Sequence, residues 1–481
     1  MRVPLSWLAD YIDLPAENTL GTVVDVLIRL GVEVDGIHRP DADLTGPLVI
    51  GRVLAIEELS EFKKPIRYCQ IDVGEAQPRG IVGGATNFAA GDLVVVALPG
   101  AVLPGGFAIS ARKTYDRVSD GMICSPRELG LGEEHSGILV LDAGLDAAPG
   151  TGAIPVLGLD DPVLELEITP DRGDLLSVRG LAREIGLGLG LASTDPGLLE
   201  PPPASGPASY EIRVEDPTGC DRFVGIAMTG LDPSAVSPAW LRRRLIQCGI
   251  RTVSLAVDVT NFVMVELGQP MHAFDLDLLT GPLVVRRATP DEKLTTLDGV
   301  GRKLSETDLL ITDDTGPIGL AAVMGGRSTE IHDGTTSLLL EAAHWDPVPV
   351  SRTSRGHGLF SEAARRFERG VDPEMTMAAI SRAAQLLAEY GGAEAAGAVV
   401  DVDSREPRAS VVLDVSLPSR VVGVDYPPEH VRDVLSRLGA TVVGGTRDGE
   451  PLTVTPPTWR ADLVDPNDVV EEIVRLSGYD Q

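Results

Sequence analysis

The chain has 481 residues, with 41 Lys and Arg against 71 Asp and Glu, which gives a formal net charge of −30. At roughly 150 residues per domain, this length predicts about three domains. A composition of 43% hydrophobic and 23% charged residues is that of a globular protein and excludes a disordered or fibrous chain. The negative charge argues against non-specific coating of nucleic acid, because phosphate binding needs Lys and Arg, but it permits a local basic site.

The cysteines and the N-terminus indicate a reducing compartment. The four cysteines are scattered without a CxxC pair, at Cys69, Cys124, Cys220 and Cys248. This spacing favours neither a zinc finger nor a disulfide framework. Acidic Asp10 and Asp13 exclude a secretory signal, and Pro and Gly interrupt the longest uncharged stretch, 93–111. We expect a soluble cytoplasmic protein with no membrane contact.

The first two units differ in texture. Residues 1–40 show apolar side chains at helical spacing, whereas 46–141 is a series of short β-type runs separated by Gly, Pro and Asn, which predicts a small barrel or sandwich. A strand, a turn and a helix follow within 164–191, and Asp174 is the predicted N-cap of that helix.

The second half of the chain begins after a Pro-, Ser- and Gly-rich linker at 196–209. A mixed α/β region extends from about residue 210 to 400. The last unit, 407–480, predicts the order β–α–β–α, with helices at 428–438 and 466–476. The chain contains no GxxxxGK[ST], HExxH or GxSxG motif, so the common nucleotide-binding and hydrolase signatures are absent.

One long motif carries a specific resemblance. The stretch VDVTNFVMVELGQPMHAFD, 257–275, resembles the bacterial phenylalanine–tRNA ligase β subunit family. MRVPLSWLADYIDLP, ITPDRGDLLSVRGLAREIG, SEAARRFERGVDP and TPPTWRADLVDPNDVVEEIVRLSGYD resemble that family in the same order. Three positions depart from its usual pattern: Asp171, Gly173 and Leu175 stand for Asn, Pro and Cys. The chain ends shortly after GYD, where the family continues, so we expect it to be the N-terminal portion of a longer β chain.

The resemblance implies a multidomain α+β fold. An OB-fold tRNA-binding barrel, 41–149, would be inserted in an N-terminal α/β unit made of 1–40 and 150–196. A mixed α/β editing region of the B3/B4 kind would occupy 208–402. A small B5-like α+β module, winged-helix-like, would occupy 403–481.

The barrel carries the candidate tRNA contacts. OB folds hold nucleic acid through cations and aromatic side chains on strands and loops. Phe62 and Tyr115 are interleaved with six candidate cations, which are Lys63, Lys64, Arg67, Arg112, Lys113 and Arg117. The alternative is that these are ordinary solvated loop charges.

An editing site has a physical motive in a phenylalanine-selecting ligase. Tyrosine differs from phenylalanine by one hydroxyl, and an apolar pocket rejects an added hydroxyl by only about 100-fold, so a second site that hydrolyses the wrong product is physically sensible. The resemblance implies that Glu341 accepts the tyrosine hydroxyl and that His272 lies near the tRNA 3′ end. It also implies a pocket lining made of Thr260, Asn261, Gly325, Gly326, Ser361 and Ala363.

Structural alternatives remain for both central residues. A lone histidine beside a phenylalanine is more often structural than catalytic. Glu341 ends an apolar run, LLLE, and its carboxylate could pair with Arg365 or Arg366.

A carboxylate cluster lies near the C-terminus. Asp468, Glu471 and Glu472 are spaced i, i+3, i+4, which places them on one helix face, and a hard cation would relieve their repulsion. The alternative is that acids near a helix N-terminus complement its dipole. The resemblance implies that these three and Asp462 bind Mg²⁺.

The resemblance thus predicts an aminoacyl-tRNA ligase β subunit that binds tRNA(Phe) and edits Tyr-tRNA(Phe). It would work in an (αβ)₂ heterotetramer, in which the α subunit uses ATP and phenylalanine, so this chain alone should not charge tRNA. The competing hypothesis is a non-catalytic RNA-binding or assembly module with a vestigial pocket.

Overall fold

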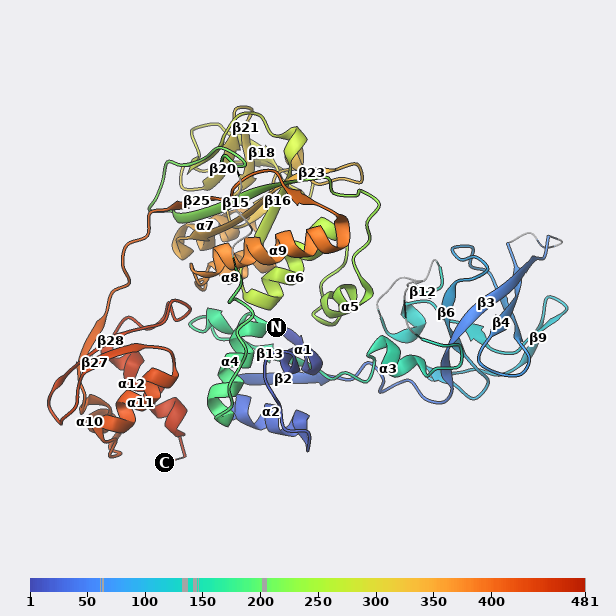
Figure 1. Ribbon diagram of the computed structural model, residues 1–481, viewed down its shortest axis with the longest axis horizontal. Helices are drawn as coiled ribbons and strands as arrows, with labels where there is room; N and C mark the ends of the chain where they lie inside the picture. Colours follow the sequence, from blue (N-terminus) through green and yellow to red (C-terminus); the bar gives the residue numbers. More distant parts are fainter. Residues whose placement is uncertain are drawn as a thin grey trace.

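The computed structural model describes residues 1–60, 62, 65–131, 137–141, 145, 147–200 and 206–480. The chain forms four units (Figure 1). The barrel extends to one side, the central region lies over the N-terminal unit, and the C-terminal unit lies on the side opposite the barrel. The mixed α+β class predicted from the sequence is confirmed.

The N-terminal unit is formed by the chain segments that precede and follow the barrel in the sequence. Its antiparallel sheet has the order β1-β13-β2 and packs against helices that include the amphipathic α2 and α4. The elements are β1 (Arg2–Pro4), α1 (Leu5–Ala9), α2 (Thr19–Arg29), β2 (Glu33–His38), α3 (Ala153–Leu157), β13 (Val163–Glu167), η2 (Gly173–Leu175) and α4 (Val178–Leu189).

The N-cap prediction in this unit was wrong. Helix α4 begins after Ser177, whose side chain accepts a hydrogen bond from the Gly180 backbone N–H. Asp174 lies in the preceding 3₁₀ turn, where its carboxylate pairs with Arg172 at 3.1 Å. A hydroxyl at the helix boundary therefore caps the helix, while the nearby buried guanidinium takes the carboxylate.

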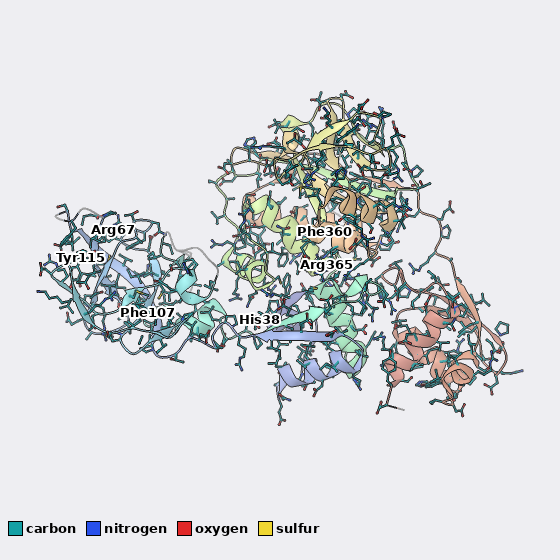
Figure 2. All side chains as sticks on the ribbon, turned by 180° about the vertical axis from the view of Figure 1, so that it is seen from behind. His38, Arg67, Phe107, Tyr115, Phe360 and Arg365 are labelled. Atoms are coloured by element: carbon teal, nitrogen blue, oxygen red, sulfur yellow. The ribbon has the colours of Figure 1, made fainter. Side chains whose placement is uncertain are left out.

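The second unit is a nearly closed barrel sheet of order β11-β6-β3-β4-β5, with β12 also paired to β6. The sheet ends approach each other where the Asp120 N–H donates to the Gly80 carbonyl. Figure 2 shows Arg67, Phe107 and Tyr115 on this unit. The elements are β3 (Leu48–Glu58), β4 (Arg67–Asp72), β5 (Arg79–Gly83), β6 (Leu93–Ala97), β7 (Val102–Leu103), β8 (Phe107–Ala108), β9 (Arg112–Thr114), β10 (Arg117–Ser119), β11 (Met122–Ile123), η1 (Arg127–Leu129) and β12 (Val140–Leu141).

The central region contains two larger sheets, with orders β16-β23-β15-β24 and β14-β17-β20-β21-β22, and β25 also pairs with β15. The strands are β14 (Ile212–Val214), β15 (Cys220–Thr229), β16 (Met271–Asp275), β17 (Leu283–Arg287), β18 (Lys293–Thr295), β19 (Gly301–Lys303), β20 (Leu309–Asp313), β21 (Gly316–Leu320), β22 (Met324–Gly325), β23 (Ser337–Trp345), β24 (Glu394–Ala395) and β25 (Val400–Asp403). The helices are α5 (Ala239–Gln247), α6 (Leu255–Leu267), η3 (Leu276–Leu278), η4 (Arg327–Thr329), α7 (Pro347–His357), α8 (Glu362–Phe367) and α9 (Met375–Gly391).

The sheet that contains β23 separates two hydrophobic cores. Leu338 and Leu340 face the core shared with α6, α9 and the N-terminal unit, whereas Leu339 and Ala343 face the second sheet. This alternation follows the period of two along a strand. It places Glu341, which has the parity of Leu339, on the side of the second sheet.

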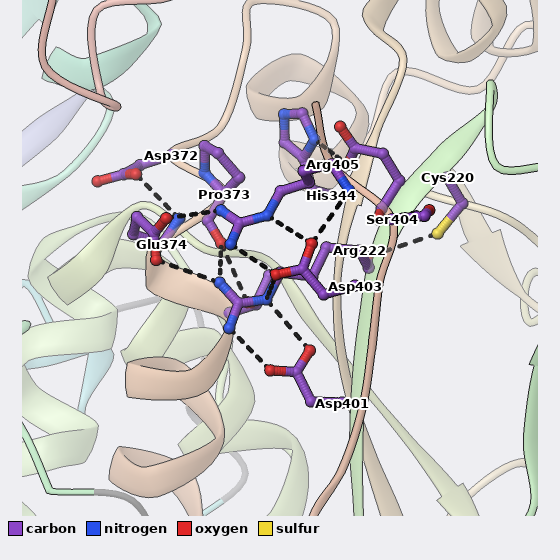
Figure 3. A network of polar contacts seen from close by, with 12 residues as sticks. Cys220, Arg222, His344, Asp372, Pro373, Glu374, Asp401, Asp403, Ser404 and Arg405 are labelled. Atoms are coloured by element: carbon purple, nitrogen blue, oxygen red, sulfur yellow. Dashed lines mark hydrogen bonds and ion pairs between the residues drawn. The ribbon is translucent and has the colours of Figure 1, made fainter. Parts of the chain in front are cut away.

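A polar network fixes β25 against β15 (Figure 3). Arg222 of β15 pairs with Asp401 of β25 at 2.9 Å and with Glu374, which precedes α9, at 3.3 Å. Arg405 also contacts Glu374, at 2.7 Å, and Asp403, at 2.7 Å. The network joins the end of the central region to its own sheet.

The C-terminal unit has a three-stranded sheet of order β26-β28-β27 against three helices. The observed order is β–α–α–β–β–α, so the β–α–β–α prediction missed a short helix and a strand. The elements are β26 (Val411–Asp414), α10 (Leu417–Val422), α11 (Pro428–Arg437), β27 (Thr441–Gly444), β28 (Pro451–Thr455) and α12 (Pro466–Ser477). The likeness to a winged helix stays a prediction.

Within the described part of the chain, no helix is both long and apolar enough to span a bilayer. The four cysteines are all free thiols.

Candidate functional site

A cavity of about 80 Å³ lies between the two sheets of the central region. It brings together four of the eight residues predicted for editing, from four separate segments. These are His272 of β16, Glu341 of β23, Gly325 of β22 and Ala363 of α8. Phe274, Trp345 and Phe367 add apolar wall.

Glu341 is a buried acid without a charge partner. Its residue surface is 5% exposed, and among the described residues its Oε2 atom has no hydrogen-bond partner. Burial raises its pKa from 4.5 to about 8. Pairing with Arg366 is excluded, because that guanidinium bonds Glu362 at 2.7 Å. Arg365 also lies nearest to Glu362, at 3.8 Å. The group is therefore largely a neutral carboxylic acid at pH 7.

His272 lies directly across the antiparallel ladder from Glu341. Its ring packs edge-on against Phe274 with 4.4 Å between centroids, and its Nε2 atom is buried without a hydrogen-bond partner among the described residues. Burial lowers its pKa from 6.5 to about 4, so the imidazole is neutral at pH 7. A neutral ring nitrogen and a neutral acid thus face the same space.

Gly325 gives the histidine ring its room. A Cβ atom at this position would lie 2.4 Å from His272 Cε1, closer than packed atoms tolerate. Gly326 does not line the cavity; a Cβ there would lie 2.4 Å from the Ile318 carbonyl oxygen, so its small size serves the strand contact behind the wall.

The remaining editing candidates lie off the cavity. Ser361 is the N-cap of α8, and its Oγ donates to the Val323 carbonyl at 2.8 Å, so it supports the wall that carries Ala363. Thr260 and Asn261 lie on α6 and are absent from the cavity lining; the Thr260 hydroxyl donates to the Val257 carbonyl at 2.8 Å. The structure therefore separates these two from Glu341 and His272.

The site contains two aromatic residues, Phe274 and Trp345, that the sequence motifs did not single out. Phe274 shares the strand face of His272 because the two are spaced i, i+2, and the period of two in MHAFD was the available signal. Trp345 follows the same rule from Glu341, four positions along β23.

The barrel cations are placed unequally. Lys63 and Lys64 lie outside the described residues. Arg67 is only 15% exposed at its side chain and bonds Glu58 at 2.8 Å, which makes it a structural residue in this conformation. Arg117 bonds Glu57 at 2.6 Å, and Lys113 pairs with Asp116 at 3.2 Å.

Among the candidate cations that the structure describes, Arg112 borders the large barrel cavity. This cavity measures about 1050 Å³ and also exposes Phe107, whose residue surface is 49% accessible. Phe62 and Tyr115 pack edge-to-face at 4.7 Å between centroids, so these two aromatic residues lie together as well as interleaved in sequence. Exposed aromatic and cationic groups of this kind suit a strand of nucleic acid.

The four C-terminal acids share another cavity, of about 400 Å³, between the N-terminal and C-terminal units. Glu472 is 3% exposed and bonds both Arg460 and Arg475, each at 2.7 Å. Those guanidinium groups hold the pKa of Glu472 far below its ordinary value, against the effect of burial. Asp462 also bonds Arg460, at 2.6 Å.

The other two acids have local partners. Asp468 accepts the N–H groups of Val464 and Asp465 in a capping box, and Glu471 accepts the Tyr479 hydroxyl. In the described part of the chain, no group of three or more His, Cys, Asp or Glu side chains is placed to hold one metal ion. As arranged, the four acids do not fit a shared magnesium site, because arginines already neutralise two of them.

Comparison with known proteins identifies the class. A family model for a putative tRNA binding domain matches residues 48–151, one for the B3/4 domain matches 219–392, and one for the tRNA synthetase B5 domain matches 411–479. The fold is that of an aminoacyl-tRNA synthetase component that carries a tRNA-binding barrel.

Relatives specify the component. The chain is 54% identical to the phenylalanine–tRNA ligase beta subunit of Thermobifida fusca and 52% identical to that of Streptomyces avermitilis, in each case over its whole length. It belongs to the phenylalanine–tRNA ligase β subunit family, and it spans 58% of the length of these two relatives. An N-terminal fragment of the phenylalanyl-tRNA synthetase beta-subunit from Pyrococcus horikoshii aligns with 66% of this chain and 88% of its own, at 14% identity and a TM-score of 0.32.

Proposed function

We propose that this chain contributes tRNA binding and hydrolytic editing to a phenylalanine–tRNA ligase, and that its central cavity removes tyrosine from Tyr-tRNA(Phe). It would act with an α subunit in an (αβ)₂ heterotetramer, where α joins phenylalanine to tRNA with ATP. The observation that carries the editing assignment is the buried, unpartnered carboxyl group of Glu341.

The carboxyl group of Glu341 supplies selectivity because it has no hydrogen-bond partner among the described residues. A buried polar group without a hydrogen bond costs about 1–3 kcal/mol. A tyrosine hydroxyl in the cavity would satisfy the carboxyl group, whereas phenylalanine would leave it unpaired. The correct product is therefore bound less well than the incorrect one, which is the discrimination that an editing site requires.

His272 suits the task of orienting water. A pKa of about 4 makes its Nε2 atom a weak base, so a role as a hydrogen-bond acceptor for water fits better than storage of a full proton. Water would add to the ester carbonyl carbon and the bond to the ribose oxygen would break. The water OH would become part of the tyrosine carboxyl group, and the other water proton would pass to the ribose oxygen, leaving tyrosine and uncharged tRNA.

The barrel supports the tRNA-binding part of the proposal. The β9–β10 hairpin carries Arg112, Lys113 and Arg117, and Arg112 also lines the large cavity. Mg²⁺ binding at the C-terminal acids stays a prediction. It would require Asp468 and Glu471 to exchange their local partners for the ion, and the proposed hydrolysis does not depend on it.

The decisive experiment measures deacylation of Tyr-tRNA(Phe) by this chain. Glu341→Ala should slow hydrolysis roughly 10- to 100-fold, the range of one lost hydrogen bond in a buried site. Aminoacylation by the complete enzyme should stay nearly unchanged. Glu306→Ala, an exposed acid in the same region, is the matched control.

The same assay separates the alternative. A non-catalytic RNA-binding or assembly module with a vestigial pocket would bind tRNA(Phe) but leave Tyr-tRNA(Phe) intact. Undiminished clearance by Glu341→Ala would overturn the assignment of Glu341, and no clearance by the unaltered chain would favour the alternative.

A further inference from the structure

Phe360 is an aromatic side chain held in solvent beside the editing cavity. Its residue surface is 83% exposed, although its neighbour Leu359 is 7% exposed and belongs to the core. The turn that separates them from α7 is well defined: Gly358 has a φ of +63°, and the Leu359 N–H donates to the Ser354 carbonyl at 2.8 Å. The turn directs Leu359 inward and leaves Phe360 outside.

The segment around Phe360 is basic in an acidic protein. Residues 351–370 contain five arginines against two glutamates, a formal charge of +3, whereas the whole chain carries −30. Arg352 and Arg355 are exposed on α7, and among the described residues neither guanidinium group has a hydrogen-bond or ion-pair partner. Arg365 keeps 30% of its side chain exposed and lies 3.8 Å from Glu362.

Phe360 is also connected to the cavity wall. The next residue, Ser361, bonds the Val323 carbonyl, and Val323 and Ala363 both line the cavity of Glu341 and His272. Figure 2 labels both Phe360 and Arg365 at the end of the central region that faces the N-terminal unit. An exposed ring and two guanidinium groups without partners among the described residues therefore lie in one short segment that also supplies part of the cavity wall.

We propose that Phe360, flanked by Arg352, Arg355 and Arg365, binds the single-stranded 3′ end of an RNA, with the ring stacked on a base and the guanidinium groups on phosphates. Stacking on an aromatic face suits every base, and arginine suits the backbone charge. The inference rests on the proposed function, because the stacked base would hold the terminal ester at the mouth of the cavity. Phe360 is thus a positioning residue.

Charge complementarity favours RNA over a protein partner. The buried centre of a protein–protein interface is more apolar than the rest of the surface and is depleted of charged residues, although arginine is enriched there. Here the exposed side chains of α7 include one apolar residue, Val348, and two arginines, Arg352 and Arg355, whose guanidinium groups have no partner among the described residues. Such a pattern matches a polyanion with unstacked bases, such as a single-stranded RNA end.

The test uses the complete 481-residue chain and a fluorescent single-stranded RNA octamer that ends in CCA. Phe360→Ala should weaken binding about ten-fold, at the lower part of the range for one base–aromatic stack, and Phe360→Trp should restore it. Val348→Ala, which trims another exposed side chain of α7 (53% exposed), is the matched control and should bind normally. Because the ring is in solvent, the melting temperature should not change.

A second variant tests the cations. Arg355→Glu should reduce the slope of log affinity against log salt by about 0.7, the value for one phosphate contact on a single strand. Single-turnover hydrolysis of Tyr-tRNA(Phe) by Phe360→Ala should then show weaker substrate binding with a nearly unchanged maximal rate, and Phe360→Trp should again restore it.

The outcomes distinguish this inference from the proposed function. Unchanged octamer binding by Phe360→Ala overturns the inference, whether or not the chain deacylates Tyr-tRNA(Phe). If Phe360→Ala instead impairs only assembly with the α subunit, the segment is a protein contact and the inference is again wrong. If the unaltered chain never hydrolyses Tyr-tRNA(Phe), the proposed function fails, and the binding result still decides the role of Phe360.

Discussion

Two buried glutamates have opposite electrostatic fates in this molecule. Glu341 in the central region and Glu472 in the C-terminal unit are 5% and 3% exposed. Burial without a cation raises the pKa of Glu341 to about 8, whereas Arg460 and Arg475 hold the pKa of Glu472 well below its ordinary value. The difference shows that partners, and not burial alone, decide whether a buried acid is charged.

The two environments also differ in what they leave open. The Glu472 network continues through Arg475 to Glu184 and through Glu184 to Arg172, so it joins α12 to α4 of the N-terminal unit. Each charged side chain of this network has an oppositely charged partner within the chain. Glu341 faces a cavity and has no hydrogen-bond partner among the described residues, so a ligand hydroxyl can supply one. The first arrangement holds two units together, and the second is available for recognition.

The largest effect should come from the paired acid. Glu472→Gln leaves Arg460 and Arg475 buried with too little negative charge, and breaking a buried pair costs about 3–5 kcal/mol. Hydrogen exchange of the α12 amides should report a loss of local stability of that size.

Glu471→Gln is the matched control on the same helix, because Glu471 is exposed. It should change stability by less than about 0.5 kcal/mol. Equal exchange rates in the two variants would mean that the buried arginines are stable without the charge of Glu472. The Glu472 network would then not be what holds α12 to the N-terminal unit.

The unpartnered acid should respond to pH in the opposite sense. The pKa of Glu341 is higher in the folded chain than its ordinary 4.5, so its contribution to stability is greatest below pH 4.5 and is lost as pH rises to about 8. Glu341→Gln removes this loss. At roughly 1.4 kcal/mol per pH unit, the variant should be about 2–4 kcal/mol more stable than the unaltered chain at pH 8.

Hydrogen exchange of β23 at pH 5 and pH 8 checks this expectation. The gap between the variant and the unaltered chain should be small at pH 5 and wide at pH 8. Glu306→Gln should show no gap at either pH. A gap that is constant with pH would mean that Glu341 does not titrate in this range.

Helix bounds could be predicted from the sequence more accurately than the contacts that distinguish the two glutamates. Pro428 and Pro466 start α11 and α12 because proline suits the first helical turn, and both helices lie within one residue of the predicted ends. Glu341 and His272 could be named from their motifs, but their pairing across a ladder depends on strand register 69 residues apart. Local spacing contains no information on that register.

The C-terminal acids show the converse difficulty. The helical spacing of Asp468, Glu471 and Glu472 was correct, but it contained no information on the arginines that pair with Glu472 and Asp462. Arg460 lies before the helix, and its partner network reaches Arg172 and Glu184 in a unit almost 300 residues earlier. A cation was therefore expected where the fold supplies guanidinium groups.

The shape of the unpartnered site should be sensitive to one added methyl group. Gly325→Ala places a Cβ atom 2.4 Å from His272 Cε1, so the ring or the strand must move. We expect a loss of about 1–3 kcal/mol in stability, the usual cost of overpacking, and slower hydrolysis of Tyr-tRNA(Phe).

Gly301→Ala in β19 is the matched glycine control, because a Cβ atom there meets nothing within 4 Å. It should leave both the melting temperature and the deacylation rate unchanged. If Gly325→Ala behaves in the same way, the close contact with His272 does not shape the cavity.

The smallest effect should come from Ser361, which links Phe360 to the cavity wall. Ser361→Ala removes the N-cap of α8 and the hydrogen bond to Val323, and the loss of one cap costs about 1 kcal/mol. Ser361→Thr keeps a hydroxyl in place and should retain most of that stability. Deacylation should fall only modestly in the alanine variant, since Ser361 supports Ala363 without lining the cavity. A loss as large as that of Glu341→Ala would instead mean that the Ser361 hydroxyl contacts the substrate directly, as Glu341 is proposed to do.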